Sequence, residues 1–214
     1  MKSVKIFFLN NFYAIFLFIF AVLICHYTGN RGIFPIDSFG HFDSGFRVLN
    51  GEHPFKDFWA ISGPFIDYIQ SLIFFLFGIN WQVYLLSSSL LNGLVSILTY
   101  YLLIRFGLDK KLSFFYSICF AILAYPSSGT PFVDHHSTFL SIIALYTLII
   151  SISTNKFFHW FLIPIFMFFA FLSKQVPAAY IILSIIIITL IHLTHQNKKI
   201  FFKIILSLTS SSVL

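Results

Sequence analysis

Charged residues are scarce in this sequence. Only 9% of its 214 residues are Asp, Glu, Lys or Arg, whereas 58% are apolar and the mean hydropathy is +0.91. Soluble domains carry about 25% charged residues, so the composition excludes an ordinary soluble domain. Two cysteines are too few for a disulfide framework. No stretch shows the sustained alternation of apolar and polar residues that is typical of a membrane β-barrel.

Long apolar runs take the place of the missing charges. Because about 20 helical residues cross the ~30 Å hydrocarbon layer of a bilayer, these runs predict an all-α, polytopic bundle of transmembrane helices. No small-residue cleavage site follows the first run, so we expect a retained span rather than a signal peptide. The expected segments are residues 6–25, 81–104, 112–125, 138–152, 157–172 and 176–193, with a further run beginning at residue 200.

We expect a single membrane domain over residues 1–214. The sequence shows no internal repeat and no linker, and it stops inside an apolar run. We therefore interpret it as the N-terminal part of a longer protein, truncated at its C-terminus, which could be inactive on its own.

The 13 Lys and Arg residues predict which loops face the cytoplasm, because cytoplasmic loops are enriched in positive charge. The ambiguous segment is the run 65–77, which either spans the membrane or lies at its surface. With this run at the surface and the N-terminus in the cytoplasm, nine of the 13 positive residues fall inside; with the run spanning, only three do. The first arrangement is favoured, and it places six of the seven acidic residues on the outer side.

The net charge of +6 does not predict a nucleic acid partner. The positive residues lie at the ends of apolar runs, where they act as topology signals. They do not form a cluster interleaved with exposed aromatic residues, as a nucleic acid surface would.

Five of the seven acidic residues lie between Asp37 and Asp67, in and just after the first outer loop. Apolar residues recur at i, i+3, i+7 and i+10 from Phe39. This spacing predicts an amphipathic helix over Asp37–Leu49 that lies along the membrane surface. Gly51 is expected to end it.

Asp37 stands at the start of this predicted helix. It would either satisfy the free backbone amides of the first turn or act chemically at the membrane surface. His41 follows four residues later on the same face, so the pair could hold a divalent metal cation or form a plain helical hydrogen bond. Asp43 and Arg47 have the same spacing and are expected to form a surface ion pair.

Polar residues recur at two later points on the predicted outer side. Asp134 precedes the run 138–152, where it would either cap the helix or, with His135 and His136, bind a substrate or a metal. Lys174 separates two apolar runs and is followed by Gln175. Lys174 would either extend to the lipid headgroups or pair with a lipid phosphate.

The outer loop has a distinctive order of residues. Asp37 is followed by Gly45, Leu49, Gly51, Pro54-Phe55 and Asp57-Phe58, then by Gly63-Pro64, Tyr68 and Leu76-Phe77-Gly78, and later by Phe171-Leu172-Ser173-Lys174-Gln175. This pattern resembles the GT-C membrane glycosyltransferases, in particular bacterial members similar to protein O-mannosyltransferases and lipid A aminoarabinose transferases. Many members have an Asp-Glu pair where this chain has Asp37-Ser38.

The resemblance implies a membrane glycosyltransferase that moves a hexosyl or pentosyl group from a polyprenyl-phosphate donor lipid to a glycan, lipid or protein acceptor. It implies a multi-pass protein of the plasma (cell inner) membrane with its active loop on the outer side. Asp37 is the implied catalytic residue. A divalent metal cation at Asp37 and His41 is compatible with the pattern but not required by it. The residues expected to contact substrate are Lys174, Gln175, Asp134, His135, His136, Asp57 and Arg47.

The alternative is a non-enzymatic transporter, flippase or assembly subunit for lipid-linked sugars. A transporter would place polar or helix-breaking residues near the middle of its spans. Asn92-Gly93, near the middle of the run 81–104, is one such feature, and no second one matches it.

Overall fold

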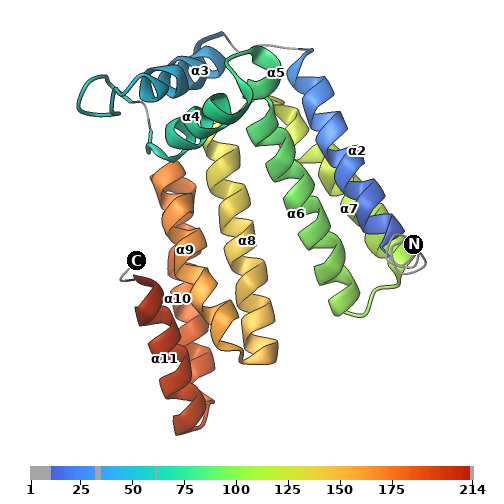
Figure 1. The fold of residues 1–214 in the computed structure, drawn as a ribbon. Coiled ribbons are helices and arrows are strands. Elements are labelled where there is room, and N and C mark those ends of the chain that lie inside the picture. Colours follow the sequence, from blue (N-terminus) through green and yellow to red (C-terminus); the bar gives the residue numbers. More distant parts are fainter. Residues whose placement is uncertain (1–10, 32–34, 61, 213–214) are drawn as a thin grey trace, which may run out of the picture. The chain divides into compact units, whose positions relative to one another are not determined.

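A computed structural model describes residues 11–31, 35–60 and 62–212 of the chain (Figure 1). Helices joined by short turns dominate this part of the protein, and its only β-type pairing is an isolated bridge between Pro54 and Phe58. The prediction of an all-α protein is confirmed. The helices are α2 (Phe12–Gly29), α3 (Pro35–Leu49), α4 (Phe65–Phe77), α5 (Trp81–Tyr84), α6 (Leu86–Arg105), α7 (Lys110–Leu123), the short 3-10 helix η1 (Tyr125–Ser127), α8 (Val133–Thr154), α9 (Phe157–Ser173), α10 (Gln175–Thr194) and α11 (Lys198–Ser212).

Among the described residues, four segments are long and apolar enough to cross a membrane: Phe12–Gly29, Trp81–Arg105, Val133–Thr154 and Gln175–Thr194. This confirms a polytopic helical protein. The apolar helix α9, with 17 residues, falls just short of that length, and α4 has only 13. At 1.5 Å per residue α4 rises about 20 Å, which is less than the ~30 Å of the hydrocarbon layer. Its length therefore fits a position at the membrane surface.

The chain divides into two compact units. Unit 1 comprises Met1–Trp59 and Ile66–Phe132, and unit 2 comprises Ala60–Phe65 and Val133–Leu214.

In unit 1, helices α2, α6 and α7 pack against one another (Figure 1). Small residues such as Ala14, Ala21 and Ala121 are buried there, with Leu17 and Tyr100 between them. Small residues allow helix backbones to approach closely, which is the usual way that helices associate in a membrane.

Asn92 joins these three helices. Its side-chain amide donates to the carbonyl oxygens of Ala21 on α2 at 2.9 Å and Ala121 on α7 at 3.0 Å. Gly93 beside it lets α2 approach α6, since a Cβ atom there would lie 2.8 Å from both Phe18 and Val22. The polar break in the middle of this span is therefore used for helix packing.

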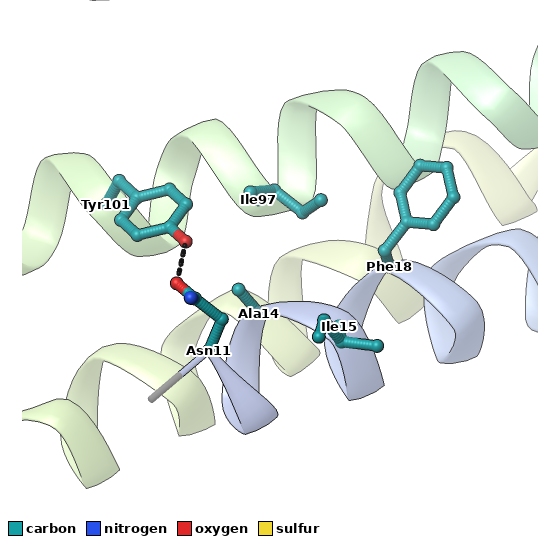
Figure 2. Close-up of a pocket in the computed structure, with 6 residues that line it drawn as sticks. All are labelled: Asn11, Ala14, Ile15, Phe18, Ile97 and Tyr101. Atoms are coloured by element: carbon teal, nitrogen blue, oxygen red, sulfur yellow. Dashed lines mark hydrogen bonds between the residues drawn. The ribbon is translucent and has the colours of Figure 1, made fainter. Parts of the chain in front are cut away.

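A shallow hollow of about 250 Å³ lies between α2 and α6 near the start of α2 (Figure 2). The Tyr101 hydroxyl donates to the Asn11 side-chain oxygen at 3.1 Å on one side of it. The rest of the lining is apolar, from Ala14, Ile15, Phe18 and Ile97. Among the described residues that line this hollow, Tyr101 carries the only ionisable group.

Unit 2 is a second bundle, formed by α8, α9, α10 and α11. Its core contains Trp160 of α9, which is fully buried and stacks on His192 of α10 with ring centroids 5.5 Å apart. His192 also contacts the Asn155 side-chain oxygen at 3.3 Å, and the Ser207 hydroxyl donates to the Phe157 carbonyl at 2.6 Å. These bonds tie the α8–α9 connection to α10 and α11.

We expect Gly93→Val to destabilise the protein. The added methyl groups would meet Phe18 and Val22, and overpacking of this kind costs about 1–3 kcal/mol. Thermal unfolding of the purified protein in detergent should show a lower midpoint. Leu94→Val at the neighbouring, 47% exposed position is the matched control and should leave the midpoint nearly unchanged. Equal midpoints for Gly93→Val and wild type would contradict the packing described here.

Candidate functional site

The predicted surface helix of the first loop is α3. Pro35 opens it, at a position where the missing backbone N–H costs nothing. The helix ends where Gly51 adopts φ = +89°, a conformation that glycine tolerates, with the Gly51 N–H donating to the Val48 carbonyl at 3.0 Å. The prediction of a helix over Asp37–Leu49 ended by Gly51 therefore agrees with the structure.

The start of α3 is fixed through Ser38, the residue after Asp37. The hydroxyl of the buried Tyr84 donates to the Ser38 carbonyl at 2.7 Å, and the Ser38 hydroxyl lies 3.0 Å from that of Thr130. Tyr84 and Thr130 come from elements 46 and 92 residues away in sequence. The backbone of Asp37 lies in α3, so its position is set by these bonds; its side chain lies outside the described residues.

The loop that supplies Thr130 is itself anchored. The Gly129 carbonyl accepts from the Ser88 hydroxyl of α6 at 3.1 Å, and Gly129 lies so close to Gly29 of α2 that neither position has room for a Cβ atom. The Phe132 N–H donates to the Tyr125 hydroxyl at 3.1 Å. Burial raises the pKa of Tyr125 well above its ordinary value, so this phenol is neutral and acts as a structural group.

Helix α3 packs on α4 and α5 through an aromatic cluster. The ring of Phe42 lies 5.0 Å from that of Phe74 and 5.3 Å from that of Tyr84 between centroids. At Gly45 the helices touch, since a Cβ atom there would lie 2.8 Å from the Gln70 side chain. The apolar stripe seen in the sequence is therefore partly covered by the protein itself.

A buried acid lies under this helix. Asp67 of α4 is 2% exposed, and its Oδ1 lies 3.2 Å from Nδ1 of His41 on α3. This contact orients the imidazole ring through Nδ1, so Nε2 is the ring nitrogen left for another partner. Within the described residues no three His, Cys, Asp or Glu side chains gather as a metal site.

Gln70 lies one turn after Asp67 and is fully buried. Its side-chain oxygen accepts from the Ser87 hydroxyl at 3.1 Å, whereas its amide nitrogen has no partner among the described residues. The polar side chains of Asp67 and Gln70 on α4 are therefore buried against α3 and α6.

Arg47 does not pair with Asp43 as expected. Its Nε donates to Glu52 Oε2 at 2.6 Å, and its guanidinium lies over the Phe58 ring at 4.5 Å. The turn at Gly51 is the reason, because it folds the chain back so that the Glu52 N–H meets the Arg47 carbonyl at 3.1 Å. The prediction of an Asp43–Arg47 ion pair was wrong, since it assumed that the helix surface alone decides the partner.

Asp57 closes the turn that follows. Its Oδ2 accepts from the His53 N–H at 2.8 Å, and its own N–H donates to the His53 carbonyl at 2.9 Å. Lys56 lies 3.8 Å from the same carboxylate. This arrangement gives Asp57 a structural task in the loop, and its predicted contact with substrate stays a prediction.

In unit 2, Lys174 and Asp134 form an ion pair across 40 residues of sequence. The Lys174 ammonium lies 2.7 Å from Asp134 Oδ1 and 2.9 Å from Oδ2, with the two side chains 37% and 39% exposed. Lys174 is the extended residue between α9 and α10, and the Ser137 hydroxyl donates to its carbonyl at 3.0 Å. The sequence singled out both residues, and the structure brings them together.

Helix α8 begins at Val133, five residues earlier than expected. Asp134, His135 and His136 therefore lie in its first turn rather than before it. Asp134 suits the positive end of the helix dipole there. His136 is buried and His135 is half-buried, and consecutive positions on a helix point in different directions. Gln175 is exposed at the start of α10.

Residues 62–65 pack against the end of α9 near Lys174. A Cβ atom at Gly63 would overlap the Leu172 carbonyl, and the rings of Phe65 and Phe169 lie 4.7 Å apart. Only glycine permits this approach. The Gly63-Pro64 motif of the outer loop therefore supports the segment that carries the Asp134–Lys174 pair.

Residues 53–214, well over half of the chain, match the sequence profile of a family described as dolichyl-phosphate-mannose-protein mannosyltransferase. The chain belongs to this family. It is a membrane protein of a glycosyltransferase family whose sugar donor is a polyprenyl phosphate, which confirms the resemblance seen in the outer loop. Among curated proteins and among solved structures, none matches the sequence.

The range that matches the mannosyltransferase family begins after α3. It contains the Asp134–Lys174 pair and the buried Asp67, but neither Asp37 nor His41. The pairing of His41 with Asp67 was not predicted from the sequence. One signal for it was present, because Asp67 and Gln70 lie in the short apolar run 65–77. It also missed Ser38 and Tyr84, which look ordinary in sequence.

We expect His41→Ala to destabilise unit 1, because it leaves the buried Asp67 carboxylate without its imidazole partner. The loss should be about 1–3 kcal/mol. Adding Asp67→Asn should restore part of the stability, since a neutral amide is cheaper to bury. His53→Ala, whose imidazole contacts the exposed Tyr68 hydroxyl, is the matched control. Thermal unfolding of wild type, His41→Ala, Asp67→Asn and the double variant measures the coupling, and strictly additive losses would contradict the pairing.

Proposed function

We propose that this protein transfers a sugar from a polyprenyl-phosphate donor to an acceptor hydroxyl at the outer face of the plasma membrane. The acceptor is a glycan, a lipid or a protein, and the sugar is a hexosyl or pentosyl group. The exposed Asp134–Lys174 pair inside the range of the family match is the observation that carries this proposal.

Lys174 has the chemistry that the donor needs. The leaving group of this reaction is a phosphate, which requires charge neutralisation more than a proton. Asp134 holds the Lys174 ammonium with both carboxylate oxygens, and because an ammonium has three N–H bonds, one remains for a phosphate oxygen. More than a third of the Lys174 side chain is exposed, so a lipid headgroup can reach it.

Asp37 serves as the base in this proposal. The acceptor hydroxyl gives its proton to the Asp37 carboxylate while its oxygen bonds to the sugar's anomeric carbon. The bond from that carbon to the phosphate oxygen breaks, and its electron pair leaves with the polyprenyl phosphate. Direct displacement with one base inverts the anomeric configuration. The support for this role is the fixed start of α3, where two hydrogen bonds hold the next residue, Ser38.

The transporter alternative rested on Asn92 in the middle of a span. Both hydrogens of its amide are taken by carbonyl oxygens of α2 and α7, and Gly93 fits against Phe18. These contacts give the two residues a packing task, so they do not favour transport over sugar transfer.

We expect Asp37→Asn and Lys174→Gln to abolish the lipid-linked sugar transfer in cells. The chromosomal gene would carry each change, and mass spectrometry would measure donor lipids and surface glycans. The donor lipid should accumulate and one sugar should disappear from a surface glycan, as in a deletion. The matched controls are Asp43→Asn, which changes another acid on α3, and Lys156→Gln, which changes another exposed lysine. Both should resemble wild type. If Asp37→Asn also resembles wild type, its role is that of a helix cap.

The outer-face orientation predicts which positions an impermeant thiol reagent can reach in intact cells. In a background with Cys25 and Cys119 replaced by serine, Gln175→Cys should be labelled and Lys110→Cys should not. Both positions are exposed on the protein, so folding does not hide either one. Labelling of both after the cells are opened provides the control. The reverse pattern in intact cells would overturn the orientation.

A further inference from the structure

We propose that the beginning of α11 is a binding site for an anionic phospholipid. The site is a hollow of about 390 Å³ lined by Gln196, Lys198, Phe201 and Phe202. It lies in unit 2, at the turn between α10 and α11, and shares no residue with the Asp134–Lys174 pair.

The positive charge at this turn is uncompensated. Lys198, Lys199 and Lys203 take part in none of the ion pairs of the described residues, and the sequence contains no Asp or Glu after Asp134. All three lysines are exposed. An anion in the hollow therefore meets the Lys198 ammonium, with Lys199 and Lys203 as further positive charges on the same helix and no acid nearby in the sequence.

The hollow also has apolar walls that continue along the helix. Lys198, Phe201 and Phe202 lie at i, i+3 and i+4, so they share one face of α11. One turn after the two phenylalanines, the same side of the helix exposes Ile205 and Leu206. Phe202 is 68% exposed and Leu206 is 61% exposed, which leaves this strip open to a ligand.

A cation at one end of an apolar strip matches the chemistry of a phospholipid. The phosphate would lie at the Lys198 ammonium, and the hydrocarbon chains would follow the two phenyl rings toward Leu206. Free phosphate would use only the cationic end, so the strip favours a lipid. Anionic headgroups are attracted by about 1 kcal/mol for each lysine at the membrane surface, which is on the order of fivefold in affinity.

The start of α7 resembles the start of α11 but carries an acidic residue beside its lysines, so it serves as an internal control. Asp109-Lys110-Lys111 opens α7 as Asn197-Lys198-Lys199 opens α11, and in both cases the Asx side chain accepts from backbone N–H groups of the first turn. Phe115 lies four residues after Lys111, as Phe202 lies four residues after Lys198. It is 59% exposed, so both helices present an exposed phenylalanine one turn after a lysine. The difference is the carboxylate of Asp109, which lowers the net positive charge.

Tryptophan reporters and brominated lipids test this proposal in the full chain. Phe202→Trp and Phe115→Trp would each be reconstituted in phosphatidylcholine vesicles with a minor fraction of phosphatidylglycerol, with one of the two lipids brominated. The protein without a reporter has three native tryptophans, and subtracting its fluorescence gives the quenching of each added tryptophan. Brominated phosphatidylglycerol should quench Phe202→Trp more strongly than its fraction of the lipid predicts. For Phe115→Trp, this excess of quenching should be clearly smaller. Lys198→Gln with Lys199→Gln should reduce the preference at Phe202→Trp by about fivefold or more.

Three outcomes would overturn the proposal. The first is equal quenching of Phe202→Trp by the two brominated lipids in proportion to their amounts. The second is a preference that survives Lys198→Gln with Lys199→Gln. The third is an equal preference at Phe115→Trp, which would show a general enrichment of anionic lipid at basic helix ends. Lys110→Gln with Lys111→Gln is the control that should leave the signal of Phe202→Trp unchanged.

Discussion

A polar group that leaves water must find a partner inside the protein, and in a chain this apolar the few polar side chains decide how the helices meet. Asn92 binds carbonyls of two neighbouring helices, and Tyr84 reaches Ser38 across 46 residues. Most of the remaining hydrophobic surface is interchangeable, because lipid tails are as apolar as leucine. The polar contacts therefore select one packing among many that would bury similar area.

The same constraint explains how helix α3 is held. If only an apolar face meeting fluid hydrocarbon held an amphipathic helix along a membrane, the helix could slide or rotate. Here Ser38 is bound at its start, His41 meets a buried acid, and Gly45 touches Gln70. Three contacts spaced along two turns leave one position for the helix. The base that we propose, Asp37, requires such placement of its helix, because a displacement of about 1 Å can cost two orders of magnitude in rate.

Local features of the fold could be predicted from the sequence, whereas tertiary pairings could not. Run 65–77 became α4 with the same bounds, because apolar length and the flanking glycines act locally. The start of α8 was missed, since Asp134 and the two histidines read as a turn and not as a first helical turn. Arg47 was assigned to Asp43 from helix spacing, but the turn at Gly51 supplied Glu52 as a nearer partner. His41 and Asp67 are 26 residues apart, and no periodicity links them.

Charge is distributed unevenly along unit 2, and this has a consequence for its place in the membrane. The N-terminal end of α10 begins next to a lysine that Asp134 neutralises, whereas its C-terminal end leads into Lys198 and Lys199 without any acid. Helix α10 has 20 residues, which is about 30 Å at 1.5 Å per residue, so these ends are one hydrocarbon layer apart. Since unpaired lysines resist crossing a bilayer more than a neutral pair does, this asymmetry supports the orientation that we propose, with the lysine-rich turn in the cytoplasm. In that proposed orientation the neutralised end lies on the opposite side, where our proposal has Lys174 meet a lipid phosphate.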